Sequence, residues 1–399
     1  MIKSLRVKNL NKRMNFDVNF FEDINIVTGI NGCGKTTLLK LLWYAVSGNL
    51  ERIVPEIIFD TFEVVTDRMT VGMTVENTHK TKRQMLKLRY SIEGSELKES
   101  DRPFERSIDW EDLNEANRLI TRTGTSIFFP TFRRIEGGFS LSAPDQGIAR
   151  YKNARFIQRG HDTLHAGEAG GLQYEINRLS DRLSVGEHRF VSSISTDDII
   201  RLLTSKYAEI SERTNRLHME LSRFIMEQVR AEPLSVGGPH ASAMGNEGES
   251  REALEEIQRR VANVTSQSES LLRPFNVLSD LIAKVFQYRG IKLAGPVTLG
   301  DTTGAIASEV LSAGEKQMLS FLSYNAFASN SCLLIDEPEI SLHVDWQRIL
   351  FPLLLQQSAG NQFIVATHSP FIYSKYADKE LMLSPDRGDE NADTEHDRG

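Results

Sequence analysis

The chain has 399 residues, 40% of them hydrophobic and 25% charged, and its formal net charge at pH 7 is −7. This length exceeds that of one small domain, and the apolar content is ample for a buried core, so we expect one globular body with an insertion. The negative balance excludes a protein that coats nucleic acid with its whole surface, although it leaves room for a local basic patch.

Cysteine usage and hydropathy indicate the compartment. The chain contains two cysteines, Cys33 and Cys332, which argues against a disulfide framework and favours a reducing cytoplasm. For Cys33 we favour a small residue that fits its loop over the alternative of a redox sensor. No apolar run approaches the roughly 20 residues that span a bilayer, and residues 1–3 open into a strand rather than a signal peptide. We therefore expect a cytoplasmic protein without a membrane partner.

The N-terminal region reads as short strands that lead to a glycine-rich loop. Apolar and polar residues alternate over residues 14–20, which predicts that this segment and residues 2–7 form antiparallel strands with one buried face. Residues 24–28 form a third, mostly apolar strand. Residues 29–36 then read Gly-Ile-Asn-Gly-Cys-Gly-Lys-Thr, and an apolar helix follows. This is the G-x-x-x-x-G-K-[ST] pattern of a phosphate-binding P-loop in its strand, loop and helix context.

The residue types of this loop suit the magnesium complex of a nucleoside triphosphate. Glycines let the backbone turn tightly, so that successive N–H groups and the N-terminus of the following helix converge on an anion. Lys35 adds a mobile cation, and Thr36 offers a hydroxyl to Mg²⁺. We therefore expect ATP and Mg²⁺ as cofactors, and we assign the nucleotide to Asn31, Gly32, Cys33, Gly34, Lys35, Thr36 and Thr37.

Further β character follows the P-loop region. It predicts an antiparallel side sheet from four segments, 57–59, 62–65, 69–75 and 86–92. The charged stretch 93–109 reads as a connection to a short helix that ends near Thr121. A buried strand then starts at Ser126 and runs toward Arg133 and Arg134.

Residues 118–159 form the only strongly basic region of the sequence. Eight basic residues stand there against two acidic ones, Glu136 and Asp145. The basic residues are Arg118, Arg122, Arg133, Arg134, Arg150, Lys152, Arg155 and Arg159. They could bind the phosphates of a nucleotide or of DNA, or they could form a solvated or ion-paired face. We weigh these alternatives equally, because a charge cluster without a readout motif is weak evidence.

Two helical patterns predict an inserted hairpin. Apolar residues recur at helical spacing over residues 196–232 and 252–272, and a Gly/Ser-rich linker, 235–250, separates the two patterns. We expect Pro233 to end the first helix and Pro274 the second. At about 1.5 Å per residue the first helix spans roughly 50 Å, which is a short protrusion rather than the long arm of a chromosome-condensing protein.

Three motifs in the C-terminal part supply further chemistry. Residues 311–317, Leu-Ser-Ala-Gly-Glu-Lys-Gln, open an apolar helix, and the unpaired N–H groups of its first turn form a second anion site. A buried strand ends in Asp336 and Glu337, and the next strand ends in His368. The aspartate can hold the Mg²⁺ shell together with Thr36, and the glutamate can orient and deprotonate an attacking water.

The order and spacing of these motifs resemble those of the ATP-binding-cassette (ABC) ATPases, with their Walker A, LSGGQ-type signature, Walker B, D-loop and H-loop segments. The close kin are the RecF, SMC and OLD-like, AAA15-type members, and Glu-Pro-Glu-Ile-Ser-Leu-His at 337–343 is typical of the OLD-like branch. The specific motifs cover residues 1–45 and 305–372. The resemblance implies an α/β P-loop NTPase fold of the ABC type, with catalysis by Lys35, Asp336, Glu337 and His368.

The resemblance also implies an assembly. In the family, the signature of one head completes the nucleotide pocket of another, so that two ATP molecules lie between two heads. With one head per chain, this protein is expected to form a homodimer that ATP closes and hydrolysis opens. An assembly larger than the dimer is an alternative. His368 is implied as the switch histidine on the γ-phosphate. The signature residues that would reach the partner's nucleotide are Ser312, Gly314 and Glu315.

Two features need separate treatment. Residues 183–187, Leu-Ser-Val-Gly-Glu, also look like a signature, but they lie far before Asp336, and we interpret them as a loop that starts a helix. No glutamine fits the family's Q-loop well. Gln84 and Gln146 are both candidates, so the link between the nucleotide and the insertion stays open.

These motifs divide the chain into four parts. We expect an N-terminal ATPase lobe with the side sheet at residues 1–180, the helical hairpin at 181–290, a C-terminal ATPase lobe at 291–384 and a disordered acidic tail at 385–399. Only about 30 residues follow His368, too few for a further domain, so we expect any nuclease to be a separate polypeptide.

The motifs define the chemistry better than its purpose. With Phe-Pro-Thr-Phe-Arg-Arg-Ile-Glu at 129–136 and the short insertion, they look like the ATPase subunits of bacterial anti-phage systems, PARIS and the Septu- or retron-associated ATPases. There the ATPase is similar to a sensor or scaffold that holds a separate nuclease or toxin. The alternative is a RecF-like ATPase of DNA repair that binds duplex DNA across closed heads. A non-hydrolysing scaffold is the third hypothesis, and the intact motif residues argue against it.

Overall fold

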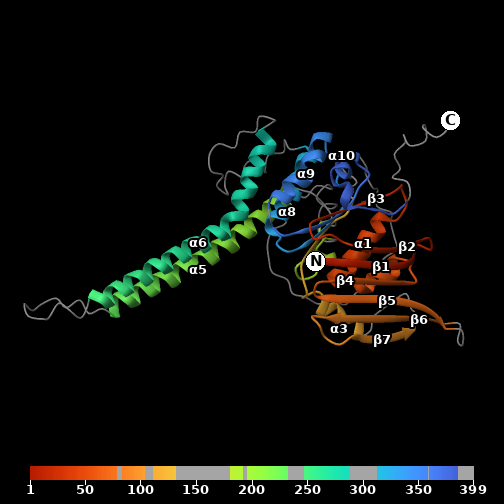
Figure 1. Ribbon diagram of the computed structural model, residues 1–399, viewed down its shortest axis with the longest axis horizontal. Coiled ribbons are helices and arrows are strands. Elements are labelled where there is room, and N and C mark those ends of the chain that lie inside the picture. Colours follow the sequence, from red (N-terminus) through yellow and green to blue (C-terminus); the bar gives the residue numbers. More distant parts are fainter. Residues whose placement is uncertain are drawn as a thin grey trace, which may run out of the picture.

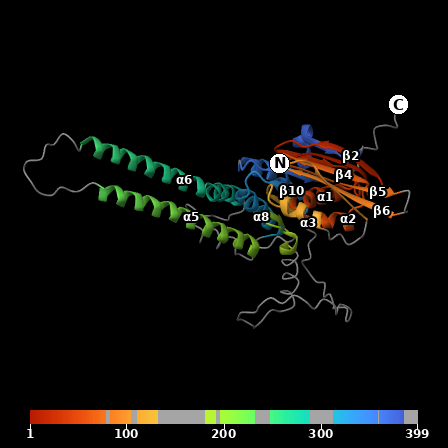
Figure 2. The same cartoon turned by 90° about the horizontal axis from the view of Figure 1, so that it is seen from below.

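The computed structural model of the chain describes residues 1–78, 83–103, 111–131, 180–191, 196–231, 247–287, 312–357 and 359–384. Within these ranges two six-stranded sheets and their covering helices form a head, from which a helical hairpin projects (Figures 1 and 2). One sheet is antiparallel and the other is parallel. The predicted α/β class with an antiparallel side sheet is therefore confirmed.

The antiparallel sheet has the strand order β2-β1-β4-β5-β6-β7. Its strands are β1 (Ile2–Leu10), β2 (Met14–Asn19), β4 (Thr61–Thr66), β5 (Met69–Thr78), β6 (Arg83–Ile92) and β7 (Lys98–Pro103). The predicted antiparallel pairing of the first two strands is confirmed, because Leu5 faces Val18 and Val7 faces Phe16. Strand β7 lies at the edge, where the charged sequence had indicated a connection only.

The strand predicted at 57–59 is absent from this sheet. Ile57 closes the last turn of α2 (Ile53–Glu56), since its N–H donates to the carbonyl oxygen of Ile53 at 2.8 Å. Ile57 and Phe59 are buried in the core. The apolar residues of this segment therefore serve packing rather than strand pairing.

The parallel sheet has the order β12-β3-β11-β10-β8-β9. Its strands are β3 (Ile24–Thr28), β8 (Ser126–Phe129), β9 (His188–Phe190), β10 (Cys332–Asp336), β11 (Gln362–Ala366) and β12 (Glu380–Met382). Every residue of β3, β8, β10 and β11 is buried. Parallel strands are covered on both faces and therefore need a nearly continuous apolar sequence.

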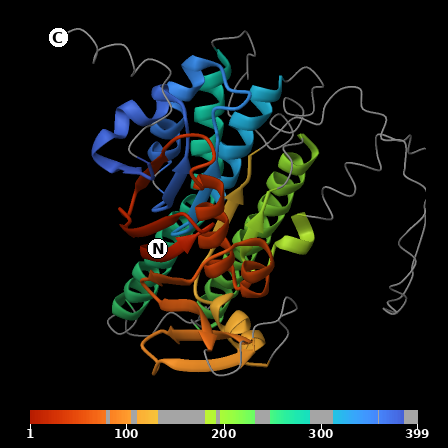
Figure 3. The same ribbon diagram turned by 90° about the vertical axis from the view of Figure 1, so that its right-hand side faces the viewer.

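Helices fill the space between the sheets and cover the outer face of the parallel sheet. α1 (Lys35–Ser47) packs with the inner face of the antiparallel sheet in one core. α8 (Ala313–Phe327), α9 (Val344–Gln356) and α10 (Pro370–Tyr373) form a second core on the other face of the parallel sheet. In Figure 3 the orange strands of the side sheet and the blue C-terminal helices lie at opposite ends of the head. The remaining short helices are η1 (Leu50–Arg52), α3 (Glu111–Ile120) and η2 (Ser374–Lys379).

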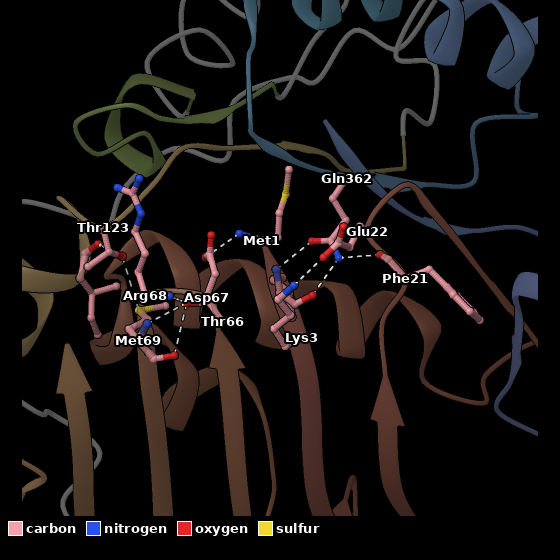
Figure 4. A network of polar contacts seen from close by, with 12 residues as sticks. Met1, Lys3, Phe21, Glu22, Thr66, Asp67, Arg68, Met69, Thr123 and Gln362 are labelled. Atoms are coloured by element: carbon pink, nitrogen blue, oxygen red, sulfur yellow. Dashed lines mark hydrogen bonds and ion pairs between the residues drawn. The ribbon is translucent and has the colours of Figure 1, made fainter. Parts of the chain in front are cut away.

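A polar network ties the start of the chain to both sheets (Figure 4). The side chain of Gln362, the first residue of β11, accepts a hydrogen bond from the N–H of Ile2 and donates to the carbonyl oxygens of Ile2 and Phe21, each at 2.8 Å. The N-terminal ammonium pairs with Asp67 at 2.7 Å. Because Gln362 is fully buried, these bonds satisfy its amide and hold β1 against the parallel sheet.

The hairpin consists of α5 (Thr196–Ala231) and α6 (Glu247–Gln287). Edge-to-face ring contacts connect it to the head: the ring centroids of Tyr207 and Phe275 are 5.8 Å apart, and those of Phe275 and Phe327, on α8, are 4.7 Å apart. Even these long helices lack the apolar character of a membrane span, and no other helix in the described ranges has it. The predicted linker as far as residue 246 and the predicted tail, 385–399, lie outside the described residues.

Pro274 lies inside α6 and does not end it, so the predicted end of the second helix is wrong. The helix also starts at Glu247, inside the predicted linker. A proline removes one N–H and crowds the preceding turn, so a helix that continues through it bends. α6 changes direction along its course in Figure 1. Burial against the head stabilises the part after the proline, through Leu278, Leu281 and Ile282.

Residues 183–187 do not start a helix, contrary to the prediction. Leu183 ends a helical turn, and residues 184–187 then lead through Gly186, with φ of 58°, into β9. In β9, His188 pairs with Ser126 of β8. The second signature-like sequence is therefore a turn between a helix and a strand. β9 belongs to the parallel sheet, although its residues fall in the range assigned to the hairpin, which itself begins with α5.

Candidate nucleotide-binding site

Four neighbouring strands of the parallel sheet end at the same edge, and the predicted motifs follow them. The strands lie in the order β3-β11-β10-β8. The P-loop follows β3, and His368 follows β11. Asp336 ends β10 and Glu337 comes directly after it, while Thr131 follows β8. The carboxyl ends of parallel strands are where open α/β sheets bind ligands. Motifs that are far apart in the sequence therefore meet at one edge.

The P-loop has the backbone that an anion cradle requires. Gly32 has φ of 78° and Gly34 has φ of 93°, values that strain any residue with a side chain. Gly34 is the N-cap of α1, and a Cβ atom on it would lie 2.4 Å from Cε of Met14. Glycine is thus required at residue 34 by its conformation, whereas the close approach is only to the flexible end of the Met14 side chain. α1 begins directly after it, so the unpaired N–H groups of its first turn belong to the loop.

Contacts from two distant segments support the loop. The N–H of Ile30 donates to Oγ of Ser384, beyond β12, at 3.0 Å. The side chain of Asn11, from the turn between β1 and β2, donates to Oγ1 of Thr37 at 3.3 Å. Cys33 is buried, 8% exposed, which suits the interpretation of a small residue that fits the loop. Asn31 and Gly32 are exposed.

Lys35 is buried and its ammonium lies within the loop. Nζ donates to the carbonyl oxygens of Gly29 at 2.9 Å and Ile30 at 3.2 Å. Burial lowers the pKa of Lys35 below its ordinary value, and the carboxylates of Glu337 and Asp336 oppose this shift. The lysine therefore lies between the loop and the carboxylates of β10, where a cation can neutralise phosphate charge.

Asp336 joins the P-loop to β10 and β8. It is 2% exposed, and its Oδ2 accepts hydrogen bonds from Oγ1 of Thr36 at 2.8 Å and from Oγ1 of Thr131 at 2.5 Å. Its Oδ1 is buried and accepts no hydrogen bond from the described residues. A buried carboxylate oxygen without a partner costs free energy that a bound cation removes.

These residues fit a magnesium ion that is shared with a nucleotide. Protein sites of this kind hold Mg²⁺ with one or two carboxylates, waters and the substrate's phosphates rather than with a cage of protein ligands. The described residues contain no group of three or more His, Cys, Asp or Glu side chains placed for a metal. Thr36 and Asp336 would hold the ion, and Oδ1 of Asp336 is the oxygen that it would satisfy.

Glu337 has a strained backbone, with φ of 49°. Its N–H donates to the carbonyl oxygen of Ala366 at 2.8 Å, and its own carbonyl oxygen accepts from the N–H of Ile340 at 3.2 Å. Non-glycine residues in the left-handed region are uncommon and cluster at functional sites. The half-buried carboxylate of Glu337 acts on the charge of Lys35, so it lies in the field of the site.

His368 is held in place by Glu339, a residue that the sequence analysis did not select. Oε1 of Glu339 accepts from the backbone N–H of His368 at 2.7 Å, and Oε2 accepts from Oγ1 of Thr367 at 2.8 Å. Burial raises the pKa of Glu339, while these hydrogen bonds oppose the shift. One carboxylate thus fixes the turn that carries the predicted switch histidine. Its signal in the sequence was the second glutamate of Glu-Pro-Glu.

The signature segment begins α8, and the structure explains two of its residues. Ser312 and Glu315 form a capping box: Oγ of Ser312 accepts from the N–H of Glu315 at 3.3 Å, and the carboxylate of Glu315 accepts from the N–H of Ser312 at 2.7 Å. A Cβ atom on Gly314 would lie 2.5 Å from the carbonyl oxygen of Ser341. Ser312 is exposed, so the start of α8 lies at the surface with its hydroxyl.

Some predicted residues lie away from this edge or outside the described ranges. Gln84 is in β6 of the antiparallel sheet, and Gln146 lies outside the described residues. Of the basic region, Arg118 and Arg122 are described and exposed, whereas the six basic residues from 133 onward are not described. The structure therefore connects neither glutamine with the site. For the basic region, phosphate binding and a solvated or ion-paired face both stay open as interpretations.

A P-loop at the carboxyl edge of a parallel sheet, with a buried lysine and a strand-end aspartate bonded to the loop threonine, defines a P-loop nucleotide-binding protein. A family model supports this assignment. Residues 1–373 match the AAA_15 model, described as AAA ATPase domain. The chain belongs to this family of ATPases.

Two solved structures are similar to the chain over most of its length. One is an Smc head domain with an extended coiled coil bound to the C-terminal domain of ScpA, derived from Pyrococcus furiosus, with 14% identity, coverage of 94% of this chain and 91% of that chain, and a TM-score of 0.35. The other is an Smc head bound to the C-terminal winged-helix domain of ScpA, with 13% identity, coverage of 97% and 95%, and a TM-score of 0.38.

Proposed function

We propose that this protein is an ABC-type ATPase that binds and hydrolyses ATP with Mg²⁺. The observation that carries the proposal is Asp336: it is buried, it accepts the hydroxyl of the P-loop residue Thr36, and its second oxygen is left for a cation. Lys35 neutralises the phosphates, and Glu337 orients and deprotonates the attacking water. His368, which follows the adjacent strand β11, acts as the switch histidine.

We further propose that two copies act together, head to head. The N-terminus of the 15-residue helix α8 supports this, because Ser312 is exposed there and the first-turn N–H groups that the capping box leaves unpaired suit a phosphate. Gly314 and Glu315 shape that terminus, the glycine by its close approach to Ser341 and the glutamate through the capping box. ATP would then join the α8 terminus of one copy to the P-loop of the other.

In the cell we assign this ATPase to an anti-phage defence system, as the sensor or scaffold that controls a separate nuclease or toxin. The motif resemblance supports this role, together with a hairpin whose first helix has 36 residues. Both cysteines are free and buried, which is compatible with the cytoplasm. The second candidate is a RecF-like ATPase of DNA repair, which the basic region, including the exposed Arg118 and Arg122, favours.

The substitution Glu337→Gln tests the catalytic mechanism. It keeps the shape of the side chain and removes the base, so we expect turnover to fall by about 100- to 10,000-fold while ATP stays bound. Light scattering on the purified variant with ATP and Mg²⁺ should show a stable dimer. Lys35→Ala is the matched control, because it should remove both ATP binding and the dimer. A Glu337→Gln protein with normal turnover, or a monomer that hydrolyses ATP, would contradict the proposal.

DNA and salt separate the two cellular roles. A repair ATPase should hydrolyse ATP faster with duplex DNA, and this stimulation should fall steeply with salt, because DNA binding releases counterions. A defence scaffold should hydrolyse ATP equally well without DNA and should co-purify with a protein encoded beside it. The measurement is ATP turnover with and without DNA at two salt concentrations, together with a pull-down from the native host.

A further inference from the structure

Thr131 lies at the same edge as the predicted site residues, within the segment 129–136, but the sequence analysis assigned it no role in the site. It follows β8, which pairs with β10 in parallel so that Phe129 lies beside Ile335. Thr131 is therefore level with the end of β10. Its Oγ1 donates to Oδ2 of Asp336 at 2.5 Å.

The hydroxyls of Thr36 and Thr131 share one acceptor. Both donate to Oδ2 of Asp336, from the P-loop at 2.8 Å and from the end of β8 at 2.5 Å. A hydroxyl has one proton to donate and two lone pairs, so each of these oxygens keeps lone pairs after it has donated. Two donors on one oxygen fix the orientation of the carboxylate and leave Oδ1 as its unpaired atom among the described residues.

Because the Asp336 carboxylate is buried, the two hydrogen bonds to it matter more than they would at the surface. Asp336 is 2% exposed, so the two hydroxyls take the place that water would have around its Oδ2. Hydrogen bonds to a charged group contribute more to stability than hydrogen bonds between neutral groups. Loss of one donor would let the carboxylate rotate away from the geometry that the cation needs.

We propose that Thr131 is a positioning residue of the magnesium site, which holds the Asp336 carboxylate so that Oδ1 faces the ion. The proposal rests on the proposed function for the identity of the nucleotide. Thr131 acts through Asp336 and does not itself hold the ion. The ion is a divalent cation that Asp336 and the phosphates of the nucleotide would share.

Thr131→Val tests this role, because valine keeps the β-branched shape and removes the hydroxyl. The probe is Mn²⁺ with a non-hydrolysable ATP analogue, followed by electron paramagnetic resonance. We expect the Mn²⁺ dissociation constant of the nucleotide complex to rise about 10-fold, the loss of one charge-assisted hydrogen bond. Nucleotide affinity in EDTA should stay unchanged. Thr131→Ser, which restores the hydroxyl, should bind Mn²⁺ like the unaltered protein.

Thr125→Val is the matched control, because Thr125 precedes β8 and its hydroxyl bonds Ser331 beside the start of β10. This variant also loses one hydroxyl hydrogen bond between the same two strands, but at the opposite edge. It should bind Mn²⁺ normally. If Thr125→Val weakened Mn²⁺ binding as much as Thr131→Val, the effect would come from the strand pair and the proposal would be overturned.

Three other results would overturn the proposal: unchanged Mn²⁺ binding by Thr131→Val, an equal loss of nucleotide affinity in EDTA, or failure of Thr131→Ser to restore binding. Failure of the proposed function would look different. The unaltered protein would then bind Mn²⁺ and the analogue without hydrolysing ATP, and the comparison of the Thr131 variants would still give its answer.

Discussion

The head and the hairpin of this chain differ in how far their side chains are buried. In the head, every residue of β3, β10 and β11 is buried, and each strand leads into a motif at the same edge. Most residues in the outer part of the hairpin are exposed, and charges pair along its surface, as Arg216 does with Glu212 at 2.6 Å. The head is specified by close packing on both faces of a sheet. The hairpin is specified by the helical spacing of its apolar residues and by surface ion pairs, each of which contributes little to stability.

This difference predicts how the two regions respond to substitution. A side chain removed from the head leaves a cavity among fixed neighbours, so the free energy of unfolding falls by several kcal/mol. A surface charge removed from the hairpin is replaced by water, and the change stays below about 1 kcal/mol. The following substitutions test the comparison, from the largest expected effect to the smallest.

Phe129→Ala should show the largest loss. Phe129 is fully buried at the end of β8, and its ring centroid lies 5.0 Å from that of Phe321 and 5.5 Å from that of Tyr324, both on α8. We expect the free energy of unfolding to fall by about 3–5 kcal/mol, measured by urea denaturation. Phe129→Leu is the control and should lose less, because it fills most of the same space. A loss below 1 kcal/mol for the alanine variant would break the comparison.

His188 should give the head a pH dependence. It is buried in β9, with Nδ1 2.8 Å from Oγ of Ser126, and burial lowers its pKa to about 4. The folded state therefore binds this proton less readily than the unfolded state, whose histidine has a pKa of about 6.5. The stability contribution is complete above pH 6.5 and is lost as the pH falls toward 4.

Between pH 7.5 and 4.5 this linkage should cost about 2–3 kcal/mol of unfolding free energy. His188→Gln removes the titrating group. The difference between the two proteins in urea denaturation at both pH values isolates the contribution from that of the carboxylates. Equal acid sensitivity of both proteins would assign the effect to other groups.

Arg260→Ala should give the smallest measurable effect. The guanidinium lies 3.9 Å from the centre of the Phe224 ring, across the hairpin, and it is half exposed. We expect a loss of about 0.5–1 kcal/mol in urea denaturation, the range of an exposed cation–π contact. Arg216→Ala, which removes only a surface ion pair, should lose no more than about 0.5 kcal/mol. Losses as large as that of Phe129→Ala would show that the hairpin is as sensitive to substitution as the head.

The parts of the fold that could be predicted are those in which local sequence and final environment agree. The P-loop needs glycines wherever it occurs, and buried parallel strands such as β10 need apolar runs, so both were found. β7 was missed because its charged sequence, Lys-Glu-Ser-Asp-Arg-Pro, suits an exposed edge strand as well as a connection. Pro274 misled because its local tendency to end a helix is overridden by the burial of residues that follow it.

In the candidate site, the residues that belong to motifs were predicted, whereas the residues that support them were not. Lys35, Thr36 and Asp336 follow from motifs, and the structure brings Thr36 and Asp336 into contact across 300 positions of sequence. Thr131 lies 205 positions from Asp336, in a segment noted only for its family resemblance, so the strand order of the sheet is what reveals its contact with Asp336. Glu339 was visible as a second glutamate, but its partners Thr367 and His368 come from the next strand.

Ring contacts run from β8 through α8 to both hairpin helices: Phe129 contacts Phe321 and Tyr324, and Phe327 contacts Phe275, which in turn contacts Tyr207. From Tyr207 to Ala231, α5 spans about 36 Å at 1.5 Å per residue. A tilt of about 5° at these rings would therefore move the far end of α5 by about 3 Å.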